Sequence, residues 1–201
     1  MITATILAAG TSSRMGFPKA LLEFHGRTFL ETILDATAAL GVQRMVVFGP
    51  GSDNILSEKD LSNVRVLYND DMDAGPIGSI RASVREVVEH PVDGLLIWPV
   101  DFPHVAIETA RVLIDAFKLG TGDIVVPCYQ ERRGHPVIFG RPVFGELLAV
   151  SNDKGARGVV RAKQDRVLNI PVDDPAVVDQ LNTPGAYQDL LRREERFRIG
   201  D

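Results

Sequence analysis

With 201 residues, of which 45% are hydrophobic and 24% charged, the chain has the length and composition of one ordinary globular domain. Its formal net charge of −5 argues against a broad basic surface for nucleic acid, and its single cysteine, Cys128, rules out an internal disulfide and argues against a zinc cluster. No apolar run approaches the roughly 18 residues of a membrane span, and the N-terminus lacks the basic start of a signal peptide, so we expect a cytoplasmic protein without a nucleic-acid or membrane partner.

Short apolar runs alternate along the chain with longer amphipathic segments. The runs are rich in Val, Ile and Leu, which predicts strands buried on both faces at Thr3–Leu7, Arg44–Phe48, Val64–Tyr68, Leu95–Val100 and Ile124–Pro127. Apolar residues spaced by three and four predict helices between them at Thr28–Leu40, Ile80–Glu89 and Ala106–Leu119. This β-α-β alternation predicts a single α/β domain over residues 1–201: a three-layer, doubly wound, mostly parallel, Rossmann-like sheet.

The later part of the chain departs from that rhythm. Val126 to Phe139 predicts two strands joined over the sheet edge by a polar turn at Gln130–Gly134. Two short helices, a further strand and a terminal helix are expected after them. Thr183 is the expected N-cap of the terminal helix, with Pro184 at its first position. The ranges are Pro142–Leu148, Ala156–Ala162, Val167–Pro171 and Pro184–Phe197.

The stretch LAAGTSSRMGFPK, residues 7–19, follows the first predicted strand. Its small residues let the backbone turn sharply and approach a ligand. Its amide groups can point at phosphate oxygens, and Arg14 and Lys19 add positive charge. The spacing of Gly10 and Gly16 is not that of a Walker A loop, and the Rossmann Gly-x-Gly-x-x-Gly pattern is absent. The loop therefore suits a nucleoside triphosphate without being either familiar phosphate loop.

One carboxylate, Asp101, stands at the end of the strand predicted at Leu95–Val100. Ligands of open α/β sheets bind outside the carboxyl ends of the strands, so the Gly10 loop and Asp101 should face one crevice. Mg²⁺ is typically held by one or two protein oxygens together with waters and substrate phosphates. Asp101 is therefore the leading Mg²⁺ ligand. The alternative is that Asp101 caps the helix predicted at Ala106–Leu119.

Residues 7–19 resemble the signature Leu-Ala-Ala-Gly-x-x-x-Arg-Met-Gly-x-x-Lys of the nucleotidyltransferases that build molybdenum cofactor dinucleotides. Four further stretches follow in the family's order: a loop that reads base and ribose, a Gly-His-Pro-Val motif, a Gly-Asp-x-Gly-Ala-Arg motif, and an Asp-x-Asp-Thr-Pro or Asn-x-Asn-Thr-Pro motif. Asn152 replaces the glycine of the third. In the fourth, Gln180 stands at the first polar position, where Asp or Asn is expected, and Asn182 falls on the second. The stretches are Gly75–Ile80, Gly134–Gly140, Asn152–Arg157 and Asp179–Pro184.

The resemblance implies a fold of the nucleotide-diphospho-sugar transferase type and a Mg²⁺-dependent nucleotidylyl transfer. A phosphate monoester would attack the α-phosphorus of a nucleoside triphosphate, and pyrophosphate would leave. It implies catalytic roles for Arg14, Lys19 and Asp101, and Mg²⁺ ligation by Asp101 and Asn182. The resemblance also implies that His135, Asp153 and Arg157 bind the acceptor. The residues implied to bind the nucleotide are Leu7, Ala8, Ala9, Gly10, Thr11, Ser12, Arg14, Lys19, Gly75, Gly78, Ser79 and Asp101.

Several alternatives stay open at this point. The subgroup most like this chain implies molybdenum-bearing molybdopterin as acceptor and a molybdoenzyme as a possible partner; a sugar phosphate or an isoprenoid-precursor phosphate would need the same chemistry. An inactive nucleotide-binding accessory protein for a molybdoenzyme is a different class. Ala9 stands where guanylyltransferases of the family have glycine, which favours CTP over GTP. Asn182 could merely cap the last helix, and His135 could be structural.

Histidines and the tryptophan outside these motifs receive structural interpretations. His25, His90 and His104 lack the spacing of metal ligands, so surface or capping roles are expected. Trp98 lies within an apolar strand and is expected in the core rather than as a stacking platform for a base.

Overall fold

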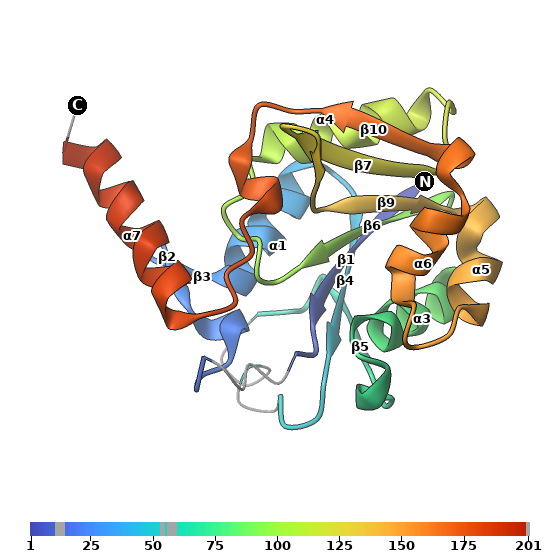
Figure 1. The fold of residues 1–201 in the computed structure, drawn as a ribbon. Helices are drawn as coiled ribbons and strands as arrows, with labels where there is room; N and C mark the ends of the chain where they lie inside the picture. Colours follow the sequence, from blue (N-terminus) through green and yellow to red (C-terminus); the bar gives the residue numbers. More distant parts are fainter. Residues whose placement is uncertain (11–14, 53–54, 56–59, 200–201) are drawn as a thin grey trace.

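The computed structural model describes residues 1–10, 15–52, 55 and 60–199. Their centre is an eight-stranded sheet in the order β10-β7-β9-β6-β1-β4-β5, with β8 paired to β7 (Figure 1). A separate hairpin pairs β2 with β3. The strands are β1 (Ile2–Ala8), β2 (Glu23–Phe24), β3 (Arg27–Thr28), β4 (Gln43–Phe48), β5 (Arg65–Tyr68), β6 (Gly94–Pro99), β7 (Ile124–Tyr129), β8 (Arg132–Arg133), β9 (Val137–Gly140) and β10 (Val167–Pro171).

The direction of the strands confirms a mostly parallel sheet. β1 pairs in parallel with both β4 and β6, β5 continues in parallel beyond β4, and β10 is parallel to β7. β9 is antiparallel to its two neighbours, β6 and β7. Each predicted strand is present, with its ends within about two residues of the prediction, as is usual for boundaries read from sequence.

Helices cover both faces of the sheet, as predicted. Strand β6 shows why: Leu96 and Trp98 pack with α1 and α4 on one face, whereas Leu95 and Ile97 pack with α3, α5 and α6 on the other. All four side chains are at most 1% exposed, which is the pattern of a strand buried on both sides. The helices are α1 (Phe29–Ala39), α3 (Pro76–Val87), α4 (Ile107–Lys118), α5 (Phe144–Ala149), α6 (Gly155–Ala162) and α7 (Pro184–Ile199).

Helix α3 begins four residues earlier than predicted. Gly75 precedes it with φ of 64°, a conformation that favours glycine, and Pro76 occupies its first position with a preset φ. Gly78 and Ser79 therefore lie in the first turn of α3 and not in a loop, which corrects the prediction for this motif. Gly78 is required by packing, because a Cβ there would lie 2.6 Å from Oδ1 of Asn69.

The segment between β7 and β9 is more elaborate than the predicted turn. Gln130 and Glu131 both have positive φ and close a tight hairpin that pairs β8 with β7. The chain then bends at Gly134–Pro136 before entering β9. β9 lies inside the sheet between β6 and β7, so the connection does not pass over a free sheet edge.

Helix α7 extends away from the body beside β2 and β3 (Figure 1). Its start is as predicted: Pro184 is the first residue, and the Thr183 hydroxyl oxygen accepts a hydrogen bond from the amide of Ala186 at 3.2 Å. Leu190 is 2% exposed, and the Tyr187 hydroxyl donates to the carbonyl oxygen of Glu23 at 2.8 Å. None of the helices in the described residues combines the length and apolar character needed to cross a membrane.

Candidate functional site

The carboxyl ends of β1 and β6 lie side by side at the edge of the sheet that the sequence singled out. The carbonyl oxygen of Leu7 accepts a hydrogen bond from the amide of Val100 at 3.1 Å, so the chain leaves both strands at one level. Asp101 follows there and is 7% exposed. The glycine loop and Asp101 therefore border a single region, as the strand polarity predicts.

Lys19, Asp101 and Asn182 meet in this region although 163 positions separate the first from the last. The Lys19 ammonium donates to Oδ2 of Asp101 at 3.1 Å and to Oδ1 of Asn182 at 2.6 Å. The side chains of Lys19 and Asp101 are only 15% and 10% exposed, so their charges interact with little solvent between them. The expectation that these three residues share one site is met by direct contacts.

Residues 172–183, here called the C-terminal strap, bring Asn182 to the site. Asp174 fixes one end: its Oδ2 accepts hydrogen bonds from the amide of Ala106 at 3.0 Å and from the Thr109 hydroxyl at 2.7 Å. Asp174 therefore ties the strap to the start of α4, whose N-cap residue is Ala106, so Asp101 does not serve as its cap. Further along, the amide of Leu181 donates to the carbonyl oxygen of Asp101 at 3.2 Å.

Gln180 is a member of the site that sequence reasoning noted only as a departure from the motif. Its side-chain Nε2 donates to Oδ2 of Asp101 at 2.9 Å. Asn182 turns its Oδ1 to Lys19, while Thr183 caps α7, so the capping alternative for Asn182 is not what the structure shows. The signal for Gln180 was its place in the motif, two residues before Asn182, which brings both side chains to one site.

The donor atoms suit a hard divalent cation. One carboxylate oxygen and one amide oxygen converge on the positively charged Lys19 ammonium, and both oxygen types are accepted ligands of Mg²⁺. In the described residues, no group of three or more His, Cys, Asp or Glu side chains gathers to form a site made of protein ligands alone. Asp101 and Asn182 are thus the residues that would hold a metal, with the remaining ligands supplied by phosphates and water.

The neighbouring strand ends form a small-residue surface beside this cluster. A Cβ on Gly49, just after β4, would lie 2.7 Å from the carbonyl oxygen of Ala9 and 3.2 Å from Sδ of Met72. Ala8 and Ala9 are each 8% exposed, Leu7 is half-buried and Gly10 is exposed. Ser79 is buried in the first turn of α3. The predicted contacts of Thr11, Ser12 and Arg14 fall outside the described residues.

His135 lies at the bend before β9, held by its amide, which donates to the carbonyl oxygen of Val177 at 2.8 Å. Burial lowers the pKa of His135 to about 4; the Asp101 charge opposes this shift and Arg157 adds to it. Both charges are therefore close enough to act on the imidazole. Its buried Nδ1 makes no hydrogen bond within the described residues. His135 thus carries a neutral imidazole with one unsatisfied polar atom.

The predicted acceptor residues on α6 and its preceding loop are exposed. Arg157 acts on His135 electrostatically, and Asp153 lies in the same segment with a pKa lowered by a hydrogen bond from Ser151. Arg81 on α3 anchors this loop by donating to Oδ1 of Asn152 at 2.7 Å and to the carbonyl oxygen of Val150. Asn152, which replaces the motif's glycine, therefore has a structural role.

Two side chains outside the motifs test the structural interpretations. Trp98 is fully buried, with its indole nitrogen donating to the carbonyl oxygen of Phe102 at 2.9 Å, so the core prediction is confirmed. The prediction that His104 is a surface or capping residue is wrong. Its side chain is 7% exposed and packs against the Phe24 ring, with Nε2 3.6 Å from Oδ2 of Asp179. Packing of the strap and β2 over residues 102–105 covers it.

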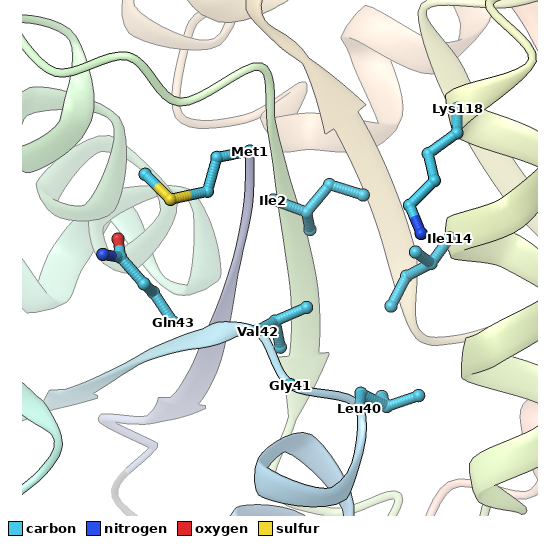
Figure 2. A pocket seen from close by; sticks show the side chains of 8 residues that line it. All are labelled: Met1, Ile2, Leu40, Gly41, Val42, Gln43, Ile114 and Lys118. Carbon is cyan, nitrogen blue, oxygen red and sulfur yellow. The ribbon is translucent and has the colours of Figure 1, made fainter.

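A pocket of about 210 Å³ lies at the opposite end of the sheet (Figure 2). The side chains around it include Met1, Ile2 at the start of β1, Gln43 of β4, and Ile114 and Lys118 of α4 (Figure 2). It therefore adjoins the amino ends of β1 and β4, where the loops that carry the motifs do not reach. The strand polarity separates this pocket from the candidate site.

Comparison with known proteins agrees with the geometry. The family description that matches is the MobA-like NTP transferase domain, over residues 4–167. The chain belongs to this family. Nicotine blue oxidoreductase of Paenarthrobacter nicotinovorans is 29% identical over 94% of this chain and 96% of its own length. Molybdenum cofactor cytidylyltransferase of Escherichia coli K12 is 24% identical over 98% and 97%.

Solved structures extend the comparison. Rv0371c of Mycobacterium tuberculosis H37Rv, in its crystal structure with manganese, is 30% identical and covers 95% of this chain and 98% of its own, with a TM-score of 0.80. The synthase of 4-diphosphocytidyl-2C-methyl-D-erythritol from Anaerococcus prevotii, at 16% identity, shares the fold, with a TM-score of 0.71 over 94% and 96% of the two chains. The sheet is thus of the nucleotide-diphospho-sugar transferase type. One relative is named an oxidoreductase, so the family alone does not fix the reaction.

Proposed function

We propose that this NTP transferase moves a nucleoside monophosphate, CMP from CTP, onto a phosphate-bearing acceptor, with molybdenum-bearing molybdopterin as the candidate acceptor. The observation that carries the proposal is the convergence of Lys19, Asp101 and Asn182 beside the glycine loop. The Lys19 ammonium lies next to a loop of small residues at the carboxyl ends of parallel strands, and this arrangement suits the binding of a triphosphate. A molybdoenzyme that receives the dinucleotide is the partner class that the proposal implies.

In this proposal an acceptor phosphate oxygen forms a bond to the α-phosphorus, the bond from that phosphorus to the bridging oxygen breaks, and pyrophosphate carries away the electron pair. The protein contributes by positioning and by neutralising charge. The Gly10 loop holds the triphosphate, and Arg14 and Lys19 offset charge on the departing pyrophosphate. Asp101 and Asn182 would hold Mg²⁺, which when bound would supply positive charge that offsets the charge on the phosphates.

The acceptor side is assigned to His135, Asp153 and Arg157. The Arg157 guanidinium supplies positive charge for an anionic acceptor. The neutral His135 imidazole leaves Nδ1 for a hydrogen bond that no described residue makes, and a buried polar atom of this kind is usually satisfied. These features support an acceptor with both a phosphate and a polar ring or hydroxyl system, which molybdopterin and a sugar phosphate both provide.

Preference for CTP rests on Ala9. Its carbonyl oxygen lies beside Gly49, where an added Cβ would come within 2.7 Å of it. A methyl group at position 9 narrows the proposed base-binding pocket, which disfavours a purine relative to a pyrimidine. The Escherichia coli cytidylyltransferase, similar over nearly the whole chain, supports the same choice.

Pyrophosphate release tests the proposal directly. The enzyme is supplied with each of the four nucleoside triphosphates and Mg²⁺, with and without molybdenum-bearing molybdopterin, a sugar phosphate or an isoprenoid-precursor phosphate. Pyrophosphate release that requires CTP and molybdopterin supports the full assignment. Pyrophosphate release with another acceptor supports the same reaction on a different acceptor substrate. Tight nucleotide binding without release from any combination would favour the accessory-protein alternative.

A further inference from the structure

The side chain of Gln180 contacts Asp101 in a way that the motif does not provide. The resembling motif has Asp or Asn at this position, each one methylene shorter than Gln. The Gln180 amide nitrogen lies 2.9 Å from Oδ2 of Asp101. Because a carboxylate can only accept hydrogen bonds, the atom that faces it must be the nitrogen, and Gln180 is a donor here.

This contact completes the fixation of Asp101. Oδ2 accepts from both Gln180 and Lys19, while the main-chain oxygen of Asp101 accepts from the amide of Leu181, the residue after Gln180. In the part of the chain that the structure describes, Oδ1 of Asp101 makes no hydrogen bond. One carboxylate oxygen is therefore held by the protein, and the other remains to ligate a cation.

We propose that Gln180 is a positioning residue that holds Oδ2 of Asp101 so that Oδ1 faces the metal, and that it leaves the metal site with a single anionic side chain. The inference rests on the proposed nucleotidyl transfer, since it assigns Asp101 to the metal of that reaction. A neutral amide at position 180 adds no negative charge, so the protein alone binds a divalent cation weakly. Strong binding then requires the phosphates of the nucleotide, which supply the missing anionic oxygens.

Two substitutions separate positioning from charge. Gln180→Met keeps the length of the side chain and removes the donor. Gln180→Glu keeps the shape but sets a second carboxylate against Asp101, where the two charges repel each other and attract a divalent cation. Gln180 is exposed, so neither change removes core packing. Gln188→Met is the matched control, because Gln188 is also exposed, lies on α7, and has no side-chain bond to the site.

The first readout is Mn²⁺ binding to the protein, measured by the electron paramagnetic resonance signal of free Mn²⁺ with and without CTP. Gln180→Glu should bind Mn²⁺ at least about tenfold more tightly than the unmodified protein in the absence of nucleotide. Gln180→Met should bind it several-fold more weakly, and Gln188→Met should be unchanged. The difference between the unmodified protein and Gln180→Glu should shrink when CTP is present.

The second readout is steady-state pyrophosphate release. Gln180→Met should lower kcat roughly tenfold with little change in the KM for CTP, because orientation of Asp101 matters most in the transition state. The proposal is overturned if both Gln180 variants bind Mn²⁺ as tightly as the unmodified protein and have the same kcat. If the unmodified protein releases no pyrophosphate with any triphosphate, the proposed function fails instead, and the Mn²⁺ titration still decides whether Gln180 orients Asp101.

Discussion

Replacing Lys19 by Met should destabilise the protein in a way that a divalent cation reverses. Lys19 is the cation that balances Asp101, and both side chains are 15% exposed or less. Breaking a fully buried pair costs about 3–5 kcal/mol and an exposed pair about 0–1 kcal/mol. For this partly buried pair we expect Lys19→Met to lower the free energy of unfolding by about 2 kcal/mol in the presence of EDTA.

Mg²⁺ bound by Asp101 and Asn182 should restore part of the lost free energy of unfolding. At about ten times its Kd, a ligand that binds only the folded protein adds roughly 1.4 kcal/mol to the free energy of unfolding. Mg²⁺ should stabilise Lys19→Met more than the unmodified protein, because in the unmodified protein the Lys19 ammonium already occupies Oδ1 of Asn182, one of the oxygens assigned to the metal. Pyrophosphate release should still fall by at least about 10²-fold, because the charge of Lys19 is missing from the transition state.

Urea unfolding in EDTA and in Mg²⁺ measures both effects. Lys118→Met is the matched control, since Lys118 is 66% exposed, pairs only with Asp115 in the described residues, and lies at the far end of the sheet. It should change stability by less than about 0.5 kcal/mol and respond to Mg²⁺ like the unmodified protein. The reasoning is refuted if Lys19→Met is as stable as the unmodified protein in EDTA, or if Mg²⁺ stabilises the two equally.

Three further predictions concern metal, pH and base choice. Asp101→Asn should keep the fold, with a loss of stability similar to that of Lys19→Met because it breaks the same pair, and should lose at least about 10²-fold in pyrophosphate release; near-normal turnover would remove Asp101 from the metal site. The pKa of His135 is about 4 in the folded protein, against 6.5 for an ordinary histidine, so the unfolded chain binds the proton first and the free energy of unfolding falls as pH drops from 6.5 toward 4. His135→Gln should abolish up to about 3 kcal/mol of that fall, as urea unfolding at pH 7 and pH 4.5 would reveal; equal pH slopes would mean that His135 is not buried as a neutral group. Finally, kcat/KM for CTP should exceed that for GTP by roughly 10–200-fold, and Ala9→Gly should narrow the gap; equal or better use of GTP by the unmodified protein contradicts the assignment.

Strand and helix content could be predicted from the sequence because each element carries its own local pattern. The runs around β1, β4 and β6 are apolar at consecutive positions, and packing on both faces of β6 explains why. The insertion of β9 between β6 and β7 could not be predicted, since it depends on which strand ends meet across the sheet. The early start of α3 was missed because Gly75 and Pro76 were interpreted as part of a ligand loop, whereas together they form a helix start.

The candidate site divides in the same way. Lys19 and Asp101 could be predicted from residue type and strand polarity, because the carboxyl ends of neighbouring parallel strands must lie together. Asn182 was predicted only from the resemblance of its motif to the family's. The contact of Gln180 with Asp101 could not, since it depends on the path of the C-terminal strap and on a side-chain length that differs by one methylene from the motif. The burial of His104 was likewise hidden, because the segments that cover it are distant in sequence.

The contacts of Lys19 also bear on the order in which substrate and metal would arrive under the proposed function. With Lys19 bonded to Oδ2 of Asp101 and Oδ1 of Asn182, the carboxylate charge is already balanced and the Asn182 oxygen assigned to the metal is already occupied. A free divalent cation therefore has to displace the ammonium from Asn182 to bind. A triphosphate changes this balance of charge. Its negative charge attracts the Lys19 ammonium, and the metal that it already binds enters the site with it. A site with one carboxylate, one neutral amide donor and one cationic side chain therefore favours entry of the metal as its nucleotide complex. The same arrangement predicts that Mg²⁺ without nucleotide stabilises the unmodified protein little, which the EDTA and Mg²⁺ unfolding curves would reveal.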